Sequence, residues 1–331
     1  MRQPAICIIG AGFHATTNIY PSLLEAGACI QAIATRDVNR SQETLLRFGS
    51  KGVAYDNHLT MLQSEPCDGV IVVAQPQDQA QLVIDCINAG KHVFVEKPLG
   101  MNKQEAQAIA DAADEAGVLV MVGFMKRYAP VYDSLRTLME KEELGTAKSF
   151  EVRFAVDSTP FCENNEQYLQ FAAIHMIDLV RYLFGEVTNV KGFHNSEGAH
   201  ISQCLTVQCY NGIVGSLYFS GMTAWSRESE KVQVTFNNGF AESEELNTLR
   251  THQSQSFTDL PWKSLEEMDT VFTPSASPMS GTMRDLYLRG FVGEMKHFLA
   301  CCEQNKTPLS NARDNVHTMA LCEAILRELE S

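Results

Sequence analysis

A short apolar run that ends in a glycine-rich turn constrains the fold of this chain most strongly. The run is Ala5 to Ile9, and Gly10-Ala11-Gly12-Phe13-His14-Ala15 follows it directly. A short strand that is apolar on both faces is typical of a parallel sheet covered by helices on both sides. The string after it fits G-x-G-x-x-G/A, in which Gly10 allows the tight turn, Gly12 lets the backbone approach a pyrophosphate, and Ala15 lets helix and strand pack closely. We therefore predict a dinucleotide-binding turn over residues 10–15, with Phe13 and His14 at the helix start that faces the anion.

The first part of the chain alternates short apolar runs with amphipathic segments. Strands are expected at 5–9, 29–35, 69–74, 92–96 and 118–124, and helices at 15–26, 39–48, 77–89 and 102–116. This rhythm with short turns indicates a doubly wound parallel sheet. Residues 1–124 are thus predicted to form a Rossmann dinucleotide-binding domain.

The pattern changes to longer alternating segments after about residue 125. Strands are expected at 148–156, 187–194, 201–210, 213–220 and 231–237, helices at 130–141, 172–184, 290–303 and 314–329, and a long polar loop at 251–282. Asn211-Gly212 between two of these strands is a strong hairpin signal. Residues 125–331 are predicted to form an α+β domain with an open, mostly antiparallel sheet, giving an α/β protein of two domains.

Composition and charge exclude several classes of partner. Lys and Arg number 26 and Asp and Glu number 40 among the 331 residues, so the formal net charge is −14. Such a chain is repelled by nucleic-acid phosphates and by anionic membrane surfaces. No apolar stretch approaches the ~20 residues of a membrane span, and the start of the chain suits a strand better than a signal peptide. The ten cysteines form no CxxC or zinc-type spacing, so we expect a reduced, cytoplasmic protein with no metal site.

The end of the second predicted strand bears on the choice between NAD and NADP. An acidic residue there binds the ribose 2′-OH, whereas arginine accommodates a 2′-phosphate. Here Thr35 takes the place of the acid and Arg36 follows it, with Arg40 one helical turn further on. Asp37 comes two residues late and could instead cap the next helix. We predict NADP as the preferred cofactor and NAD as the alternative.

Three further segments carry a resemblance to a known family. They are Glu96-Lys97-Pro98 within AGKHVFVEKPLGMNKQEA, GFMKRYAP at 123–130, and IHMIDLVRYLFG at 174–185. In this order and spacing the chain resembles, over essentially its whole length, the Gfo/Idh/MocA family, which includes glucose–fructose oxidoreductase and inositol dehydrogenase. The resemblance implies an NAD(P)-dependent oxidoreductase that acts on sugars, cyclitols or related polyhydroxylated substrates. It also implies that the open sheet of the second domain holds substrate and makes oligomer contacts, so a homodimer or homotetramer is expected.

The resemblance assigns roles to individual residues. Lys97 matches the catalytic lysine, which lies beside the nicotinamide and binds the substrate oxygen, and His175 matches a second catalytic position. Tyr128 and Asp178 are further substrate-binding candidates, and Asp178 shares a helix face with His175. Arg127 could bind a cofactor phosphate or a substrate carboxylate, with an interdomain salt bridge as the equal alternative. The remaining cofactor-binding candidates are Ala74, Gln75, Pro76, Gln79 and Glu96.

One departure from the family pattern leaves the chemistry open. Many members carry Asp four residues before the histidine, where this chain has Phe171. A phenyl ring takes up no proton, so the usual lysine–aspartate–histidine relay is incomplete. A non-catalytic regulatory protein that binds a dinucleotide or sugar, or a reductase of imines or enones on the same fold, are the alternatives to a dehydrogenase.

Overall fold

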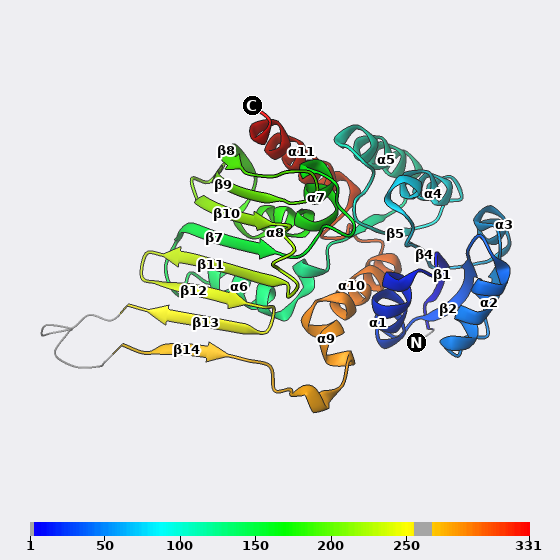
Figure 1. Ribbon diagram of the computed structural model, residues 1–331. Helices are drawn as coiled ribbons and strands as arrows, with labels where there is room; N and C mark the ends of the chain where they lie inside the picture. The colour runs from blue at the N-terminus through cyan, green and yellow to red at the C-terminus, as the bar shows by residue number, and fades with distance from the viewer. Residues whose placement is uncertain (1–2, 255–266) are drawn as a thin grey trace, which may run out of the picture. The chain divides into compact units, whose positions relative to one another are not determined.

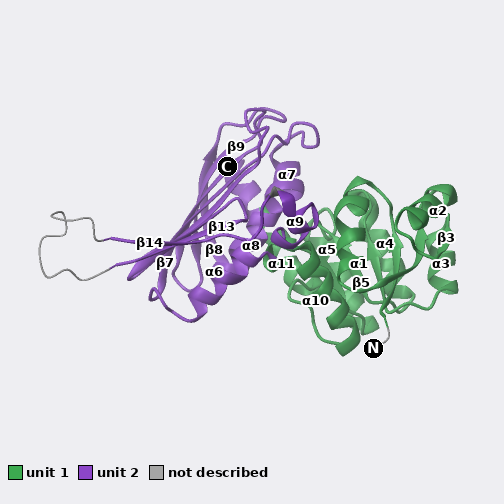
Figure 2. Ribbon diagram, turned by 90° about the horizontal axis from the view of Figure 1, so that it is seen from below, with its two compact units in different colours: residues 1–128, 290–323 green, residues 129–289, 324–331 purple. Residues whose placement is uncertain are grey.

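The computed structural model describes residues 3–254 and 267–331 of the chain. They divide into two units, the first taking Met1–Tyr128 and Gly290–Glu323 and the second taking Ala129–Arg289 and Ala324–Ser331 (Figure 2). The change between the units at Tyr128 lies close to the expected domain boundary. Residues 290–323 differ from the expectation because they return to the first unit, where the Val122 N–H donates to the Ser310 carbonyl at 2.8 Å.

The first unit is built on a six-stranded sheet in the order β3-β2-β1-β4-β5-β6, with every pairing parallel (Figure 1). Its strands are β1 (Ala5–Ile9), β2 (Cys29–Ala34), β3 (Val53–Tyr55), β4 (Gly69–Val72), β5 (Val93–Glu96) and β6 (Val120–Gly123). This confirms the predicted doubly wound sheet. Because the strands are parallel, the segments that follow β1, β2, β4 and β5 leave the sheet at the same edge.

Helices cover this sheet, and the sequence patterns missed one strand and one helix of the unit. They are a π-helical segment (Ala15–Ile19) continued by α1 (Tyr20–Glu25), α2 (Val38–Arg47), α3 (His58–Ser64), α4 (Pro76–Asn88), α5 (Lys103–Ala116) and α10 (Phe291–Gln304), with a 3₁₀ turn at Met125–Tyr128 and the closing helix α11 (Ala312–Leu329). The missed elements are β3 and α3. A three-residue strand and a two-turn helix are too short to show a period.

The second unit contains an eight-stranded sheet in the order β14-β13-β12-β11-β7-β10-β9-β8. Its strands are β7 (Ala147–Ala155), β8 (Val187–His194), β9 (Ser202–Cys209), β10 (Val214–Ser220), β11 (Ser229–Phe236), β12 (Gly239–Glu244), β13 (Thr248–Gln253) and β14 (Asp269–Phe272). The β7–β10 pair is parallel and the other pairs are antiparallel. The mostly antiparallel sheet was therefore predicted correctly.

Helices of the second unit lie on one face of this sheet only (Figure 2). They are α6 (Pro130–Glu140), α7 (Asn165–Tyr168) with a π-helical segment (Leu169–Ala173), α8 (Ile174–Phe184) and α9 (Met283–Leu288). On the covered face, the rings of Phe150 and Phe184 stack at 3.9 Å between centroids. The opposite face carries the alternating polar positions that the sequence showed, so the sheet is open as predicted.

In the second unit, one predicted turn is confirmed and one predicted loop is wrong in part. The Asn211-Gly212 hairpin is confirmed, since the Gly212 N–H donates to the Cys209 carbonyl at 2.9 Å and Gly212 has φ +87°. The long loop expected at 251–282 is wrong in part, because β13 ends within it and β14 lies in it, while residues 255–266 lie outside the described part. The residues of β14 are all exposed, and an edge strand that buries little shows no apolar alternation.

In the described ranges, no helix has the length and apolar character needed to cross a membrane.

Candidate functional site

The glycine turn after β1 has the geometry of a phosphate cradle. Gly10 has φ +107°, and a Cβ placed there would come within 1.9 Å of the Val73 carbonyl oxygen, so only glycine fits. Its N–H donates to the Ala34 carbonyl at 2.9 Å, which joins the turn to the end of β2. A Cβ at Gly12 would meet nothing within 4 Å. The backbone at Gly12 therefore faces open space, which fits the close approach of a pyrophosphate.

The helix that starts at this turn offers backbone donors to an anion. The first N–H groups of a helix have no acceptor within the helix, and here they come from residues at and after Gly12. The Thr16 hydroxyl donates to the Gly12 carbonyl at 3.1 Å, and this hydrogen bond stabilises the turn. Phe13 is 83% exposed, so its side chain stands clear of the backbone donors. Phe13 and His14 can thus serve a dinucleotide through their N–H groups.

In the segment after β2, Asp37 caps the next helix, and the side chain of Arg36 is exposed. Asp37 accepts a hydrogen bond from the Asn39 N–H at 2.9 Å and is the N-cap of α2. Thr35 is tied to the same turn, since its hydroxyl donates to the Asp37 carbonyl at 2.7 Å. Arg36 is exposed and makes no hydrogen bond or ion pair within residues 3–254 and 267–331. Arg40 donates to the Ala11 carbonyl at 2.8 Å, so its guanidinium lies against the glycine turn.

The segment after β4 leads into α4 and is tied to the Lys97 turn. Gln75 is the N-cap of α4, and Pro76 occupies its first turn. Gln75 is exposed, whereas Ala74 is half-buried. The buried Gln79 side chain donates to the Pro98 carbonyl at 3.0 Å. Gln79 thereby links the start of α4 to the turn that carries Lys97.

Glu96, the last residue of β5, is a buried carboxylate with a histidine partner. It is 6% exposed, and the His14 Nε2 lies 2.9 Å from its Oε1. Burial raises the pKa of Glu96, but electrostatic attraction to His14, the hydrogen bond from His14 and the charge of Lys97 outweigh burial, so the pKa is lowered overall. Lys97 follows, half-buried, at the edge where the strands end, and the Lys97-Pro98 peptide bond is cis.

Arg127 and Tyr128 are packed into the interior of the first unit. The side chain of Arg127 is 3% exposed and donates to the Leu309 carbonyl at 2.7 Å and to the Asp314 carboxylate at 2.5 Å. Tyr128 is half-buried, its ring lies 5.3 Å from that of His297, and burial of the phenol group raises its pKa. Arg127 is therefore held by a structural ion pair within its own unit.

The candidates of the second unit lie at the start of α8. His175 is half-buried and Asp178, on the next turn, is 1% exposed. Phe171 lies in the π-helical segment that leads into α8. Two of the helices that carry predicted site residues, the one after the glycine turn and α8, thus begin with a π-helical widening, which is frequent at functional sites.

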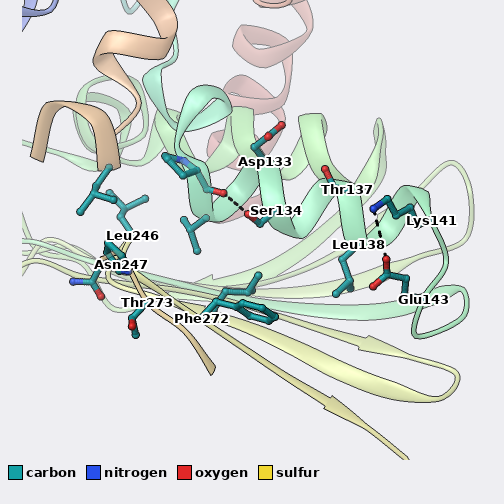
Figure 3. Close-up of a pocket in the computed structure, with 15 residues that line it drawn as sticks. Asp133, Ser134, Thr137, Leu138, Lys141, Glu143, Leu246, Asn247, Phe272 and Thr273 are labelled. Atoms are coloured by element: carbon teal, nitrogen blue, oxygen red, sulfur yellow. Dashed lines mark hydrogen bonds and ion pairs between the residues drawn. The ribbon is translucent and has the colours of Figure 1, made fainter. Parts of the chain in front are cut away.

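Two hollows in the second unit do not involve the predicted site residues. One, of about 470 Å³, lies among α6, the β12–β13 turn, the residues after β14 and α9 (Figure 3). The other, of about 540 Å³, lies on the open face of the sheet and is lined by residues that include Phe193 and Tyr218. As to metals, no group of three or more potential ligands comes together in the part of the chain that the structure describes.

Sequence reasoning overlooked two residues that build the Glu96 environment. Asn18 lies one helical turn after His14, and its Nδ2 is 2.9 Å from the His14 Nδ1. The i, i+4 spacing was a signal that could have found this contact. Gly123 pairs with Glu96 across β5 and β6. No local pattern indicates that a carboxylate occupies the space above this glycine.

Comparison with known proteins decides the family. Residues 5–124 match the oxidoreductase family with an NAD-binding Rossmann fold, Gfo/Idh/MocA, and residues 132–242 match the Gfo/Idh/MocA C-terminal domain. The chain belongs to the Gfo/Idh/MocA family. This confirms the resemblance of the three segments and makes the chain an oxidoreductase with an NAD-binding fold.

Individual relatives of this Gfo/Idh/MocA protein are distant but span nearly its whole length. An scyllo-inositol 2-dehydrogenase (NAD(+)) of Bacillus subtilis is 24% identical over 310 residues, which cover 90% of this chain and 85% of that protein. The crystal structure of a dehydrogenase from Chromobacterium violaceum has a TM-score of 0.89 at 20% identity and covers 100% and 96% of the two chains. A levoglucosan dehydrogenase in complex with NADH and levoglucosan has a TM-score of 0.84 at 16% identity, covering 99% and 98%. At these identities the two structures establish the fold alone.

Proposed function

We propose that this Gfo/Idh/MocA protein is an NADP-preferring dehydrogenase or reductase. It transfers a hydride between the nicotinamide and a carbinol carbon of a sugar, a cyclitol or a related polyhydroxylated compound. The observation that carries the proposal is that the glycine turn and Lys97 follow two parallel strands, β1 and β5, at one edge of one sheet. Ligands of such sheets bind at this edge. The relatives named for inositol and levoglucosan support the substrate class.

The cofactor would be held by the residues around the glycine turn. The pyrophosphate fits the open backbone at Gly12, and the adenosine ribose would reach the segment after β2. There Asp37 is engaged as a helix cap, while Arg36 is exposed and Arg40 lies on the glycine turn. Two guanidinium groups beside the ribose favour a 2′-phosphate. The preference for NADP rests on these residues of the chain, since the relatives cited above are named with NAD(+) and NADH.

The side chains of the protein would handle the proton while the bound nicotinamide supplies or accepts the hydride. Lys97 would bind the substrate oxygen and stabilise its charge as the carbon–hydrogen bond forms or breaks. His175 would assist as a second proton-transfer group, with Asp178 orienting it. Arg127, which is buried, and Tyr128, which is half-buried, would support the turn after β6 and so the shape of the site.

A second candidate reaction is favoured by Phe171. Reduction of an imine or of an unsaturated ring needs one proton donor and no full relay, so a phenyl group at this position is compatible with it. Lys97 would then be the donor. A substrate panel that includes imines and enones beside polyols distinguishes the two reactions.

The open face of the second sheet is proposed to form a homodimer or homotetramer contact. Phe193 on β8 is 85% exposed and Val214 on β10 is 47% exposed. Tyr218, also partly exposed, faces the same side, because Cys204 of β9 pairs with both Phe193 and Tyr218. Exposed apolar groups gathered on an uncovered sheet mark an interaction surface.

The experiment that tests the proposed function is a turnover screen with Lys97→Met as the matched variant. Oxidation of polyols, and reduction of the corresponding ketones, is followed through the absorbance of the reduced nicotinamide. We expect the parent to turn over at least one polyol or ketone with NADP(H), and Lys97→Met to lose 10²-fold or more in kcat, on the order of a general acid–base contribution. Equal turnover by Lys97→Met and the parent would contradict the assignment of Lys97.

A further inference from the structure

A chain of hydrogen bonds connects the helix after the glycine turn with the strand end that precedes Lys97. The Asn18 Nδ2 lies 2.9 Å from the His14 Nδ1, and the His14 Nε2 lies 2.9 Å from the Glu96 Oε1. Asn18 and Glu96 are buried, at 7% and 6% exposure, and the His14 side chain is 41% exposed. The chain thus runs from inside the first unit, through an imidazole that reaches solvent, to a buried carboxylate.

Both ring nitrogens of His14 take part in these hydrogen bonds. The amide nitrogen of Asn18 is a donor only, so the His14 Nδ1 accepts. The Nε2 carries a hydrogen and donates to Glu96. This hydrogen bond orients the Glu96 carboxylate.

The surroundings of Glu96 are shaped to hold this carboxylate in place. A Cβ at Gly123, its partner on β6, would come within 3.1 Å of the Glu96 Cδ and Oε2, so the glycine leaves the room that the carboxylate occupies. The His14 ring packs on Phe291 of α10, with 5.8 Å between centroids. The charged groups that act most on Glu96 are His14, from the first helix, and Lys97, the next residue in its own chain.

We propose that His14 and Asn18 are positioning residues that hold the Glu96 carboxylate ionised and oriented beside Lys97, so that Lys97 keeps its ammonium form up to a higher pH. This inference rests on the proposed function, in which Lys97 binds the reacting oxygen. An anion next to an amine favours its charged form. Within the first unit, Glu96 is the carboxylate that directly precedes Lys97 in the chain.

The test measures the protonation of Lys97 directly and needs no substrate. The acetylation rate of Lys97 by acetic anhydride is followed as a function of pH by peptide mass spectrometry in the intact protein. In Glu96→Gln, which keeps the shape of the side chain, and in His14→Phe, which keeps a ring against Phe291, we expect Lys97 to become reactive at a pH lower by about one unit. His14→Gln, which restores an N–H donor, should recover most of this shift.

A second histidine–carboxylate pair in the same unit provides the matched control. The His58 Nε2 lies 2.8 Å from the Asp85 Oδ2. His58 belongs to α3 and Asp85 to α4, and neither residue neighbours Lys97 in the sequence. His58→Phe is expected to leave the reactivity profile of Lys97 unchanged. The inference is wrong if Lys97 becomes reactive at the same pH in Glu96→Gln and in His14→Phe as in the parent protein. It is also wrong if His58→Phe shifts this pH as much as those two variants do.

Kinetics separate this inference from the proposed function. With a substrate from the turnover screen, His14→Phe should lower kcat about tenfold and displace the pH profile, while KM for the dinucleotide stays within about twofold. A rise in KM with kcat unchanged would instead make His14 a cofactor ligand and would overturn the positioning role. Unaltered turnover in Lys97→Met overturns the proposed function, whatever the labelling shows.

Discussion

Replacing Gly12 by alanine separates cofactor binding from fold stability in this protein. A Cβ at this position meets nothing within 4 Å, so the free energy of unfolding should stay within about 0.5 kcal/mol of the parent value. The added methyl group occupies the space into which a pyrophosphate must come. Loss of one charge-assisted hydrogen bond, at about 1.5–3 kcal/mol, corresponds to a dissociation constant raised about 10- to 150-fold.

The assays are urea unfolding followed by circular dichroism and fluorescence titration with NADPH. Gly10→Ala is the matched comparison, because its Cβ would lie 1.9 Å from the Val73 carbonyl oxygen at φ +107°. This variant should be destabilised by at least about 2 kcal/mol through backbone strain. Binding of NADPH by Gly12→Ala with the affinity of the parent would refute the placement of the pyrophosphate at this turn.

Four further predictions concern charge and assembly. Arg36→Ala should raise the dissociation constant of NADPH about tenfold and leave that of NADH unchanged in the same titration. Asp37→Ala, which removes the cap of α2, should lower the free energy of unfolding in urea by about 1 kcal/mol and should not weaken the binding of one dinucleotide more than that of the other. A selective loss of NADH binding would make Asp37 a ribose ligand. The pKa of Glu96 is lowered in the folded state from an ordinary value of 4.5, so its contribution to stability is present above about pH 4.5 and is lost as the pH falls through the folded value. The stability of the parent relative to Glu96→Gln should therefore decline below about pH 4.5 in urea titrations, and a constant difference would contradict this. Phe193→Glu should shift the protein towards monomer in sedimentation velocity, whereas Tyr210→Glu, at an equally exposed turn position, should not.

Much of the first unit was predictable because local chemistry and fold agree there. The turn requires a positive φ at Gly10 and an open backbone at Gly12, and the glycine motif in the sequence indicates both requirements. The parallel strands are buried on both faces, so continuous apolar runs identified them. The return of residues 290–323 to this unit could not be foreseen, since it depends on a long-range pairing of Ser310 with Val122.

The sequence named the residues of the candidate site but not the contacts that they make in the structure. The sequence pointed to Glu96, Lys97 and His14, but not to the hydrogen bond between His14 and Glu96, which joins residues 82 positions apart. Asp37 was ambiguous between ribose ligand and helix cap, and only its bond to the Asn39 N–H shows the cap. Side-chain contacts between elements depend on packing, and periodicity carries no information about them.

A fluorescence titration of the purified protein with NADPH and, separately, with NADH tests the central claim most directly. The account predicts that both dinucleotides bind at the glycine turn and that NADPH binds more tightly, because Arg36 and Arg40 are proposed to bind the 2′-phosphate. Tighter binding of NADH would contradict the role of the two arginines. Binding of neither dinucleotide would contradict the proposed oxidoreductase reaction itself.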